Sequence, residues 1–257
     1  MKTDRDIVEA LARGIRVLQC FTAARTELGG TEIAQLLKLP QSTVWRLCHT
    51  LFDLGLLVPG RDPDKLRPGP GVLTLGVSAL TGSGIAAAAL RPMQRLADQF
   101  GLAVSLAARS GTEMVVVQRA EVPSILRLAF HVGTSLRVAN SALGCAHLAG
   151  LTTEDRLALI PALERESGAE WPAHAALIET CLAHYARAGY VQNFRVYHAD
   201  VNAIGVPVIS ADGRHVLALN CGGAASVATP EMLDGPVAEG LKALARSLSP
   251  LLAERGA

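Results

Sequence analysis

The stretch from residue 31 to residue 57, TEIAQLLKLPQSTVWRLCHTLFDLGLL, constrains the fold of this chain more than any other. Its apolar residues recur at helical spacing on both sides of Leu39-Pro40, where the residue before proline disfavours helical backbone. The pattern predicts a short helix over residues 31–39, with Thr31 as its N-cap, and a second helix over residues 41–54, ended by Gly55. The apolar stripe of the second helix consists of Val44, Leu47, Cys48, Leu51 and Leu54.

The other face of the second helix carries an unusual set of side chains, namely Gln41, Ser42, Thr43, Trp45, Arg46 and His49. A helix that reads DNA buries one stripe and leaves hydrogen-bonding side chains free to reach base edges and phosphates. Gln41 and Arg46 can make bidentate contacts with bases, and the short hydroxyls of Ser42 and Thr43 suit phosphates. Trp45 can pack against a sugar or a thymine methyl group. This face therefore predicts a recognition helix.

The segments on either side complete a known motif. Residues 6–21 form an amphipathic helix with Ile7, Leu11, Ile15 and Leu18 on one face, and residues 56–70, LLVPGRDPDKLRPGP, predict a hairpin. Three helices followed by a hairpin make a winged helix-turn-helix, which presents its third helix to the major groove of double-stranded DNA. The hairpin residues that could contact phosphate or the minor groove are Arg61, Lys65 and Arg67. The alternative is a protein-interaction module of three helices with Trp45 buried.

The rest of the chain predicts a second domain of a different kind. A helix leads to a Gly/Ser break near residue 82, so we expect domains at 1–81 and 82–257. Residues 102–107 and 114–118 predict neighbouring antiparallel strands, and the stretches NAIGVPVIS and HVLALNCG predict two more, joined by ADGR. Helices are segregated from these strands along the chain, so the second domain is expected to be α+β.

Composition excludes several classes of protein. The formal net charge is +1, so a DNA partner must be argued from pattern and not from bulk charge. No stretch approaches the roughly 20 apolar residues of a membrane span, and the N-terminus shows no signal peptide. The five cysteines are scattered without a C-x-x-C pair, which is typical of reduced thiols in the cytoplasm. The histidines show no zinc-binding spacing, so we expect neither a metal nor a cofactor.

A cysteine-dependent enzyme in the second domain is the other alternative. Cys145 and His147 are two residues apart on an expected helix and would point about 200° from one another, so they should not form a dyad. Cys221 is flanked by strand residues and is expected to pack in the sheet. The sequence therefore predicts no catalytic residue.

Five stretches in this order carry a family resemblance: RGIRVLQCF, the stretch at residues 31–57, LRPGPGVLTLG, VGTSLRVANSALGCAHLAGL and GVPVISADGRHVLALN. Over nearly its whole length the chain resembles the IclR-type (isocitrate lyase regulator) transcription factors. The resemblance implies a linker helix after the winged helix-turn-helix and a GAF-like effector-binding domain. It also implies homodimers through the N-terminal part, often paired into homotetramers, and a metabolite that alters operator binding. Two-fold symmetry predicts a pseudo-palindromic operator.

The resemblance also implies an effector pocket. Its apolar walls fall at Leu128 and Leu136, and backbone N–H groups at a helix start, which suit a carboxylate, fall at Ala142 and Leu143. The remaining expected positions come from the late strands and are Asn193, Ala203, Asn220 and Gly222. The chain departs from the family where Asn193 replaces a carboxylate. The LALN ending resembles the branch that regulates aromatic-acid catabolism, which suggests an aromatic or other small organic acid as effector.

Overall fold

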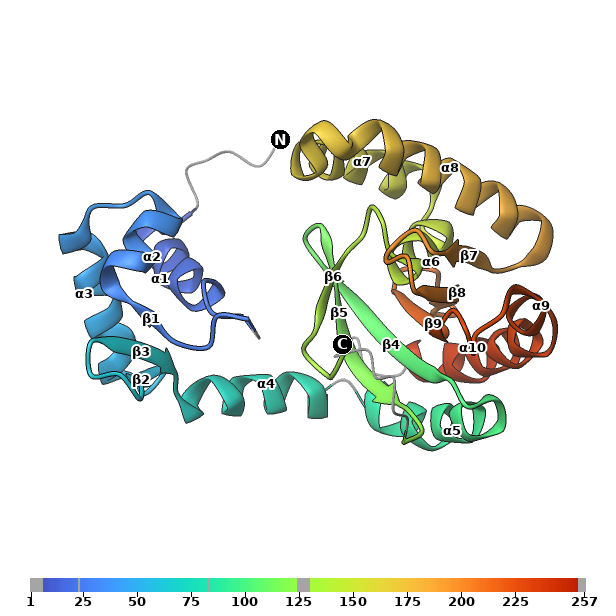
Figure 1. Ribbon diagram of the computed structural model, residues 1–257, viewed down its shortest axis with the longest axis horizontal. Coiled ribbons are helices and arrows are strands. Elements are labelled where there is room, and N and C mark those ends of the chain that lie inside the picture. The colour runs from blue at the N-terminus through green and yellow to red at the C-terminus, as the bar shows by residue number, and fades with distance from the viewer. Residues whose placement is uncertain (1–6, 23, 83, 124–129, 254–257) are drawn as a thin grey trace. The chain divides into compact units, whose positions relative to one another are not determined.

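The computed structural model describes residues 7–22, 24–82, 84–123 and 130–253 and divides into two compact units between Gly82 and Ser83 (Figure 1). The N-terminal unit is made of helices and a small antiparallel sheet of order β1-β3-β2. Its elements are α1 (Glu9–Gln19), β1 (Leu28–Gly29), α2 (Gly30–Leu37), α3 (Gln41–Asp53), β2 (Leu57–Pro59), β3 (Lys65–Pro68) and α4 (Pro70–Gly82). The expected winged helix-turn-helix is confirmed.

The turn between α2 and α3 forms as the proline predicts. Lys38 adopts the left-handed conformation (φ 54°), and the Leu39 N–H donates to the Ala34 carbonyl at 3.1 Å. Pro40 occupies the N-cap position of α3, and its carbonyl accepts from the N–H of Val44 at 3.1 Å. The cap expected at Thr31 is wrong. Helix α2 begins one residue earlier, because the Glu32 carboxylate accepts from the N–H of Gly29 at 2.7 Å and so fixes the helix start there.

Apolar residues from α1, α2, α3 and β2 form the core of the N-terminal unit, among them Val17, Ile33, Val44, Leu51 and Leu57. Two parts of the expected apolar pattern lie outside this core. Leu54 is 65% exposed, since α3 ends at Asp53 and Gly55 (φ 68°) turns the chain away. The first three residues of the expected α1 face, Ile7, Leu11 and Ile15, are also exposed.

The C-terminal unit is an α+β fold, as the sequence predicts, around one antiparallel sheet of order β6-β5-β4-β9-β8-β7. The strands are β4 (Ala103–Ser110), β5 (Glu113–Ala120), β6 (Ser135–Arg137), β7 (Val191–Phe194), β8 (Val201–Ile209) and β9 (Val216–Ala224). The longer helices are α5 (Ile85–Phe100), α6 (Ala142–Gly150), α7 (Thr153–Ser167), α8 (Trp171–Ala188) and α10 (Ala238–Ala253). A short helix α9 (Pro230–Met232) and one π-turn over Leu233–Val237 lead into α10.

The sheet separates two apolar cores (Figure 1). Helices α5 and α10 cover one face, where Val104, Ile204 and Cys221 point. Helices α6, α7 and α8 lie on the other face. Because successive strand residues point to opposite faces, Ala103, Ala203 and Gly222 belong to the α6 face. That face carries the pocket described below.

Two glycines set how closely α6 packs against its surroundings. A Cβ atom at Gly205 on β8 would lie 2.7 Å from the Ala142 carbonyl oxygen. A Cβ atom at Gly144 would lie 2.0 Å from the carbonyl oxygen of Val138, in the turn after β6. The first turn of α6 therefore packs directly against the backbone of β8 and of that turn. Across the described ranges, no helix is long and apolar enough to cross a membrane.

Candidate DNA-binding face and effector pocket

The outward face of α3 carries the side chains that the sequence assigns to DNA. Trp45 is 67% exposed, which contradicts the alternative in which this residue is buried. Its ring lies 5.3 Å from that of His49, and His49 pairs with Asp53 at 3.1 Å one turn further on. The Trp45 ring is therefore accessible to a binding partner.

The remaining predicted residues of α3 differ in how free they are. Gln41, Ser42 and Arg46 are exposed, and Thr43 is half-buried. The Gln41 side-chain amide donates to the Thr31 hydroxyl at 2.7 Å, which leaves its carbonyl oxygen as an acceptor for a base edge. Only Gln41 among these side chains is therefore held in place by α2.

The wing residues are fixed by backbone and acidic contacts. The Arg61 N–H donates to the Glu27 carboxylate at 3.2 Å, which leaves its guanidinium exposed at the hairpin tip. Lys65 lies 3.7 Å from Glu32, and the Arg67 Nε donates to the Pro59 carbonyl at 3.2 Å. These three cations line one hollow of the surface, from which a wing could contact phosphates.

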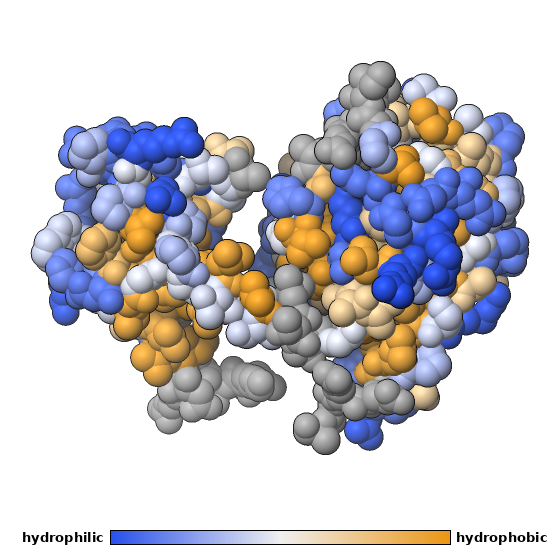
Figure 2. Space-filling model, turned by 90° about the horizontal axis from the view of Figure 1, so that it is seen from below, coloured by the Kyte–Doolittle hydropathy of each residue, from blue (hydrophilic) through white to orange (hydrophobic). Residues whose placement is uncertain are grey.

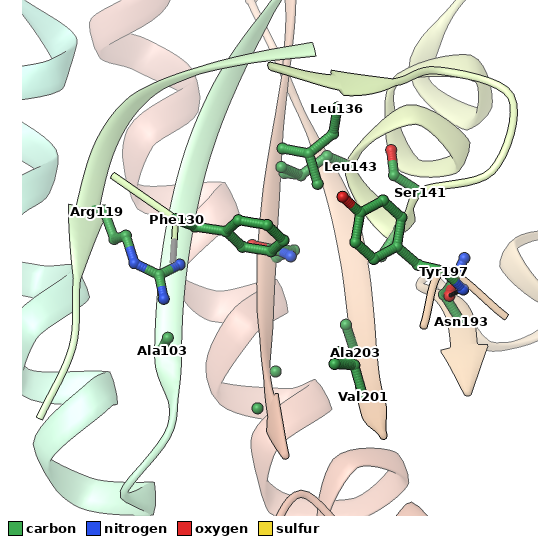
Figure 3. Close-up of a pocket in the computed structure, with 14 residues that line it drawn as sticks. Ala103, Arg119, Phe130, Leu136, Ser141, Leu143, Asn193, Tyr197, Val201 and Ala203 are labelled. Carbon is green, nitrogen blue, oxygen red and sulfur yellow. Dashed lines mark hydrogen bonds between the residues drawn. The ribbon is translucent and has the colours of Figure 1, made fainter. Parts of the chain in front are cut away.

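The C-terminal unit holds a pocket whose floor is a row of cross-strand neighbours (Figure 3). Ala103 on β4 faces Gly222 on β9, Gly222 faces Ala203 on β8, and Ala203 faces Asn193 on β7. Gly222 keeps this floor flat, since a Cβ atom there would lie 2.5 Å from the Asn202 carbonyl oxygen. Four strands that are distant in sequence thus build one surface.

The first turn of α6 forms one wall of the pocket. Ser141 is its N-cap, and the Ser141 hydroxyl accepts from the Gly144 N–H at 3.0 Å. Ala142 and Leu143 line the pocket, and their N–H groups belong to the first turn, whose amides have no partner within the helix. Such amides bind anions well, because they are unpaired and carry the positive end of the helix dipole.

The structure brings together most of the residues that the resemblance placed in the pocket. Lining positions that the sequence predicted are Leu136, Ala142, Leu143, Asn193, Ala203, Asn220 and Gly222. Leu128 lies outside the described residues. Both polar ends of Asn193 are used within the chain, since its amide donates to the Asn140 carbonyl at 2.9 Å and its oxygen accepts from the Tyr197 N–H at 3.0 Å. Asn193 therefore holds the loop that carries Tyr197.

Sequence reasoning missed three large side chains of the pocket, Arg119, Phe130 and Tyr197 (Figure 3). The Phe130 ring lies between the other two, 5.7 Å from the guanidinium carbon of Arg119 and 5.9 Å from the ring of Tyr197. Together they narrow the pocket, and the volume accessible to the centre of a water-sized molecule is about 30 Å³. A polar Gln-Arg pair that ends an apolar strand, VVVQR, was the one sequence signal for Arg119.

The two cysteines considered as nucleophiles, Cys145 and Cys221, lack the surroundings that such chemistry requires. Cys145 and Cys221 are fully buried, and burial raises the pKa of the Cys221 thiol to about 12. His147 does not face Cys145 as a base, because its Nε2 accepts from the Arg109 Nε at 3.1 Å. Thiols are nucleophilic only as thiolates, so a pKa this high keeps Cys221 inert. No group of three metal-binding side chains occurs in the part of the chain that the structure describes.

A winged helix-turn-helix joined to an α+β domain with a small pocket defines the chain as a DNA-binding transcriptional regulator and not an enzyme. The model of the IclR helix-turn-helix domain matches residues 10–60. The model of the bacterial transcriptional regulator IclR C-terminal domain matches residues 77–250. The chain therefore belongs to the IclR family.

Known proteins agree with this assignment. The HTH-type transcriptional regulator TsaQ1/TsaQ2 of Comamonas testosteroni is 32% identical over 205 residues, which cover 79% of this chain and 73% of that protein. The crystal structure of an IclR family regulator from Brucella abortus matches with a TM-score of 0.87 at 32% identity, over 97% of this chain and 94% of that one. An IclR homologue from Microbacterium hydrocarbonoxydans, complexed with 4-hydroxybenzoate, matches with a TM-score of 0.73 at 26% identity, over 95% and 98%.

Proposed function

We propose that this protein binds a pseudo-palindromic DNA operator as a homodimer or homotetramer and responds to a small organic acid, most simply an aromatic one. Residues 1–81 supply the DNA-binding part and residues 82–257 the effector-binding part. The observation that carries the proposal is the outward face of α3, where Trp45, Arg46 and His49 are left in solvent. Because a bacterial operator lies in the cytoplasm, we place the protein there.

Unpartnered apolar residues on the N-terminal unit support the oligomer. Leu11 and Ile15 on α1 line a groove with Leu54, all three exposed, and Leu73 and Leu75 on α4 are exposed as well. Figure 2 shows such apolar patches on the surface of this unit. Contiguous apolar surface marks association sites, and a two-fold dimer through this surface would present two α3 helices to the half-sites of a palindrome.

The pocket supports an acidic effector. Free amides at the start of α6 suit a carboxylate, and the apolar walls suit a ring. A ring does not fit the present space of about 30 Å³, so its entry must displace Phe130 or Tyr197. A ligand shifts the dimer toward the arrangement that it binds more tightly. The shift equals the difference between its binding free energies for the two arrangements, and a difference of a few kcal/mol changes operator occupancy by orders of magnitude.

The proposal is tested with DNA that flanks the gene of this protein. Full-length protein is titrated against that DNA and against scrambled competitor across a salt series, since salt dependence alone reports phosphate contacts. Arg46→Ala should lose about 1–3 kcal/mol of specific binding, whereas Arg214→Ala, an exposed change in the other unit, should bind normally. Normal binding by Arg46→Ala with an intact fold would show that α3 is not the recognition helix.

A further inference from the structure

Gln41 is the first residue of α3, the helix that faces DNA in the proposed function. The N-terminal residues of a recognition helix are the ones that contact base edges in the major groove. Gln41 is exposed, yet its side chain is held, because its Nε2 donates to the Thr31 hydroxyl at 2.7 Å. Thr31 lies in the first turn of α2, which packs against α3 (Figure 1). One helix of the motif therefore orients a base-reading side chain of the other.

The Thr31 hydroxyl is available for this contact because it does not cap its own helix. The start of α2 is fixed by Glu32, whose carboxylate accepts from the Gly29 N–H at 2.7 Å. A threonine at a helix start commonly accepts from a backbone N–H of the first turn. Here the hydroxyl instead accepts from Gln41, ten positions away along the chain. Among the described residues, the Thr31 side chain thus serves the orientation of Gln41 and not the start of α2.

An amide that is held by its nitrogen presents a defined set of groups to DNA. A glutamine side chain has two N–H donors and one carbonyl oxygen. With one N–H donated to Thr31, the carbonyl oxygen and the second N–H of Gln41 remain for a base. Adenine offers the complementary pair in the major groove, with N7 as acceptor and the N6 amino group as donor. Guanine offers two acceptors, N7 and O6, so it has no donor for the Gln41 oxygen.

The contact with Thr31 also removes an alternative. A flip about the last bond of a free glutamine side chain exchanges its oxygen and its nitrogen, so a free Gln41 could present either group to a base. Holding the nitrogen at Thr31 selects one of the two orientations before DNA binds. A long side chain that is already ordered loses less conformational entropy on binding. The pair should therefore discriminate between bases better than Gln41 alone.

We propose that Thr31 is a positioning residue for DNA recognition and that the Thr31–Gln41 pair reads an adenine at one position of each operator half-site. The inference rests on the proposed function, in which α3 enters the major groove. Gln41 makes the contact with the base, and Thr31 acts through Gln41. Loss of the Thr31 hydroxyl should therefore change which base is preferred at this position.

The test measures base preference, which a merely structural role of Thr31 would not change. Full-length protein selects sequences from a random double-stranded DNA library, and its affinity is then measured for the best sequence and for each single-base change of that sequence. One position of each half-site should prefer adenine over guanine by about fivefold or more, the effect of one bidentate contact. Gln41→Ala should abolish the preference at this position and leave the other positions selective.

Variants of Thr31 separate positioning from general support. Thr31→Val keeps the shape of the side chain without the hydroxyl and should bring adenine and guanine toward equal affinity at the Gln41 position. Thr31→Ser retains a hydroxyl and should keep the adenine preference. In a Gln41→Ala background, Thr31→Val should have no further effect at this position, since the two residues act as one unit. Thr180→Val, the same change on an exposed residue of α8, should leave the whole profile unchanged.

Other results overturn the proposal. A preference for guanine at the Gln41 position would mean that the amide turns its nitrogen toward DNA. An unchanged profile for Thr31→Val would mean that Gln41 is oriented without Thr31, and equal losses at every position would mean that Thr31 only supports the pair of helices. Selection of no sequence by the wild-type protein would refute the proposed function itself. A selected operator without an adenine at the Gln41 position would refute this inference alone.

Discussion

Stability of the C-terminal unit should fall steeply in mild acid because of one buried histidine. His147 on α6 is 3% exposed, and its Nε2 accepts a hydrogen bond from Arg109, so the ring is neutral with its proton on Nδ1. Burial, with the neighbouring Arg109 charge, lowers the pKa of His147 to about 4 from 6.5. The charged form would be removed from water and would repel Arg109.

The size of the effect follows from the two pKa values. As pH falls below 6.5, His147 becomes protonated in the unfolded chain but stays neutral in the folded chain until pH approaches 4. The free energy of unfolding therefore declines between pH 6.5 and pH 4. The stabilising contribution is complete above pH 6.5 and lost below pH 4. A shift of about 2.5 units at 1.36 kcal/mol each gives about 3 kcal/mol, a large share of the 5–15 kcal/mol that stabilises a typical domain.

Urea unfolding from pH 7.5 to pH 4 measures this contribution. The chain has two tryptophans, one in each unit, so a Trp45→Phe background leaves Trp171 as the reporter of the C-terminal unit. His147→Gln keeps an acceptor for Arg109 and cannot titrate. The unfolding free energies of the two proteins should separate by about 3 kcal/mol on going from pH 7.5 to pH 4. Parallel pH profiles would refute the argument, because they would show that His147 is protonated with little penalty in the folded state.

Three further substitutions test the architecture of the pocket and the sheet. Gly205→Ala places a methyl group 2.7 Å from the Ala142 carbonyl and should cost about 1–3 kcal/mol in urea unfolding while weakening benzoate binding; wild-type stability would contradict the close approach of α6. Asn193→Ala frees the loop that carries Tyr197, so the effector response should weaken in operator titrations while operator affinity without effector stays unchanged; an unchanged response would remove Asn193 from the site. Cys221→Ala should lower stability by about 1–2 kcal/mol without any change in DNA binding, because the thiol is packed against α5 and α10.

Local sequence signals predicted the elements around each site well. Leu39-Pro40 separates α2 from α3, with Pro40 as the N-cap of α3, and Gly55 follows the end of α3 in the left-handed conformation, as the sequence predicts. These signals act within one turn of backbone, so neighbouring residues suffice to determine them. The cap expected at Thr31 failed because Glu32 satisfies the helix start from inside the first turn.

Pocket residues that come from different strands were predicted only through the resemblance to the IclR family. The resemblance located Leu136, Asn193 and Gly222, which the structure brings to one pocket from different strands. It gave no sign of Arg119, whose importance depends on standing across from Ser105 on the next strand. Register between strands is a tertiary property and cannot be deduced from either strand alone.

The sequence by itself determined the helix-turn-helix, the order of elements and the family, because helix periods, caps and turns depend on residues close together in the chain. Only the tertiary structure decided which apolar faces are covered. The spacing of Leu11 and Ile15 shows that they share a helix face, yet both side chains stay exposed among the described residues of the N-terminal unit. In the same way, only the pairing of β5, β4 and β9 places Arg119, Ser105 and Asn220 in one row across the sheet. The physical reason is that the periodicity of a helix or strand determines which side chains share a face. The packing of distant elements determines which residues contact that face.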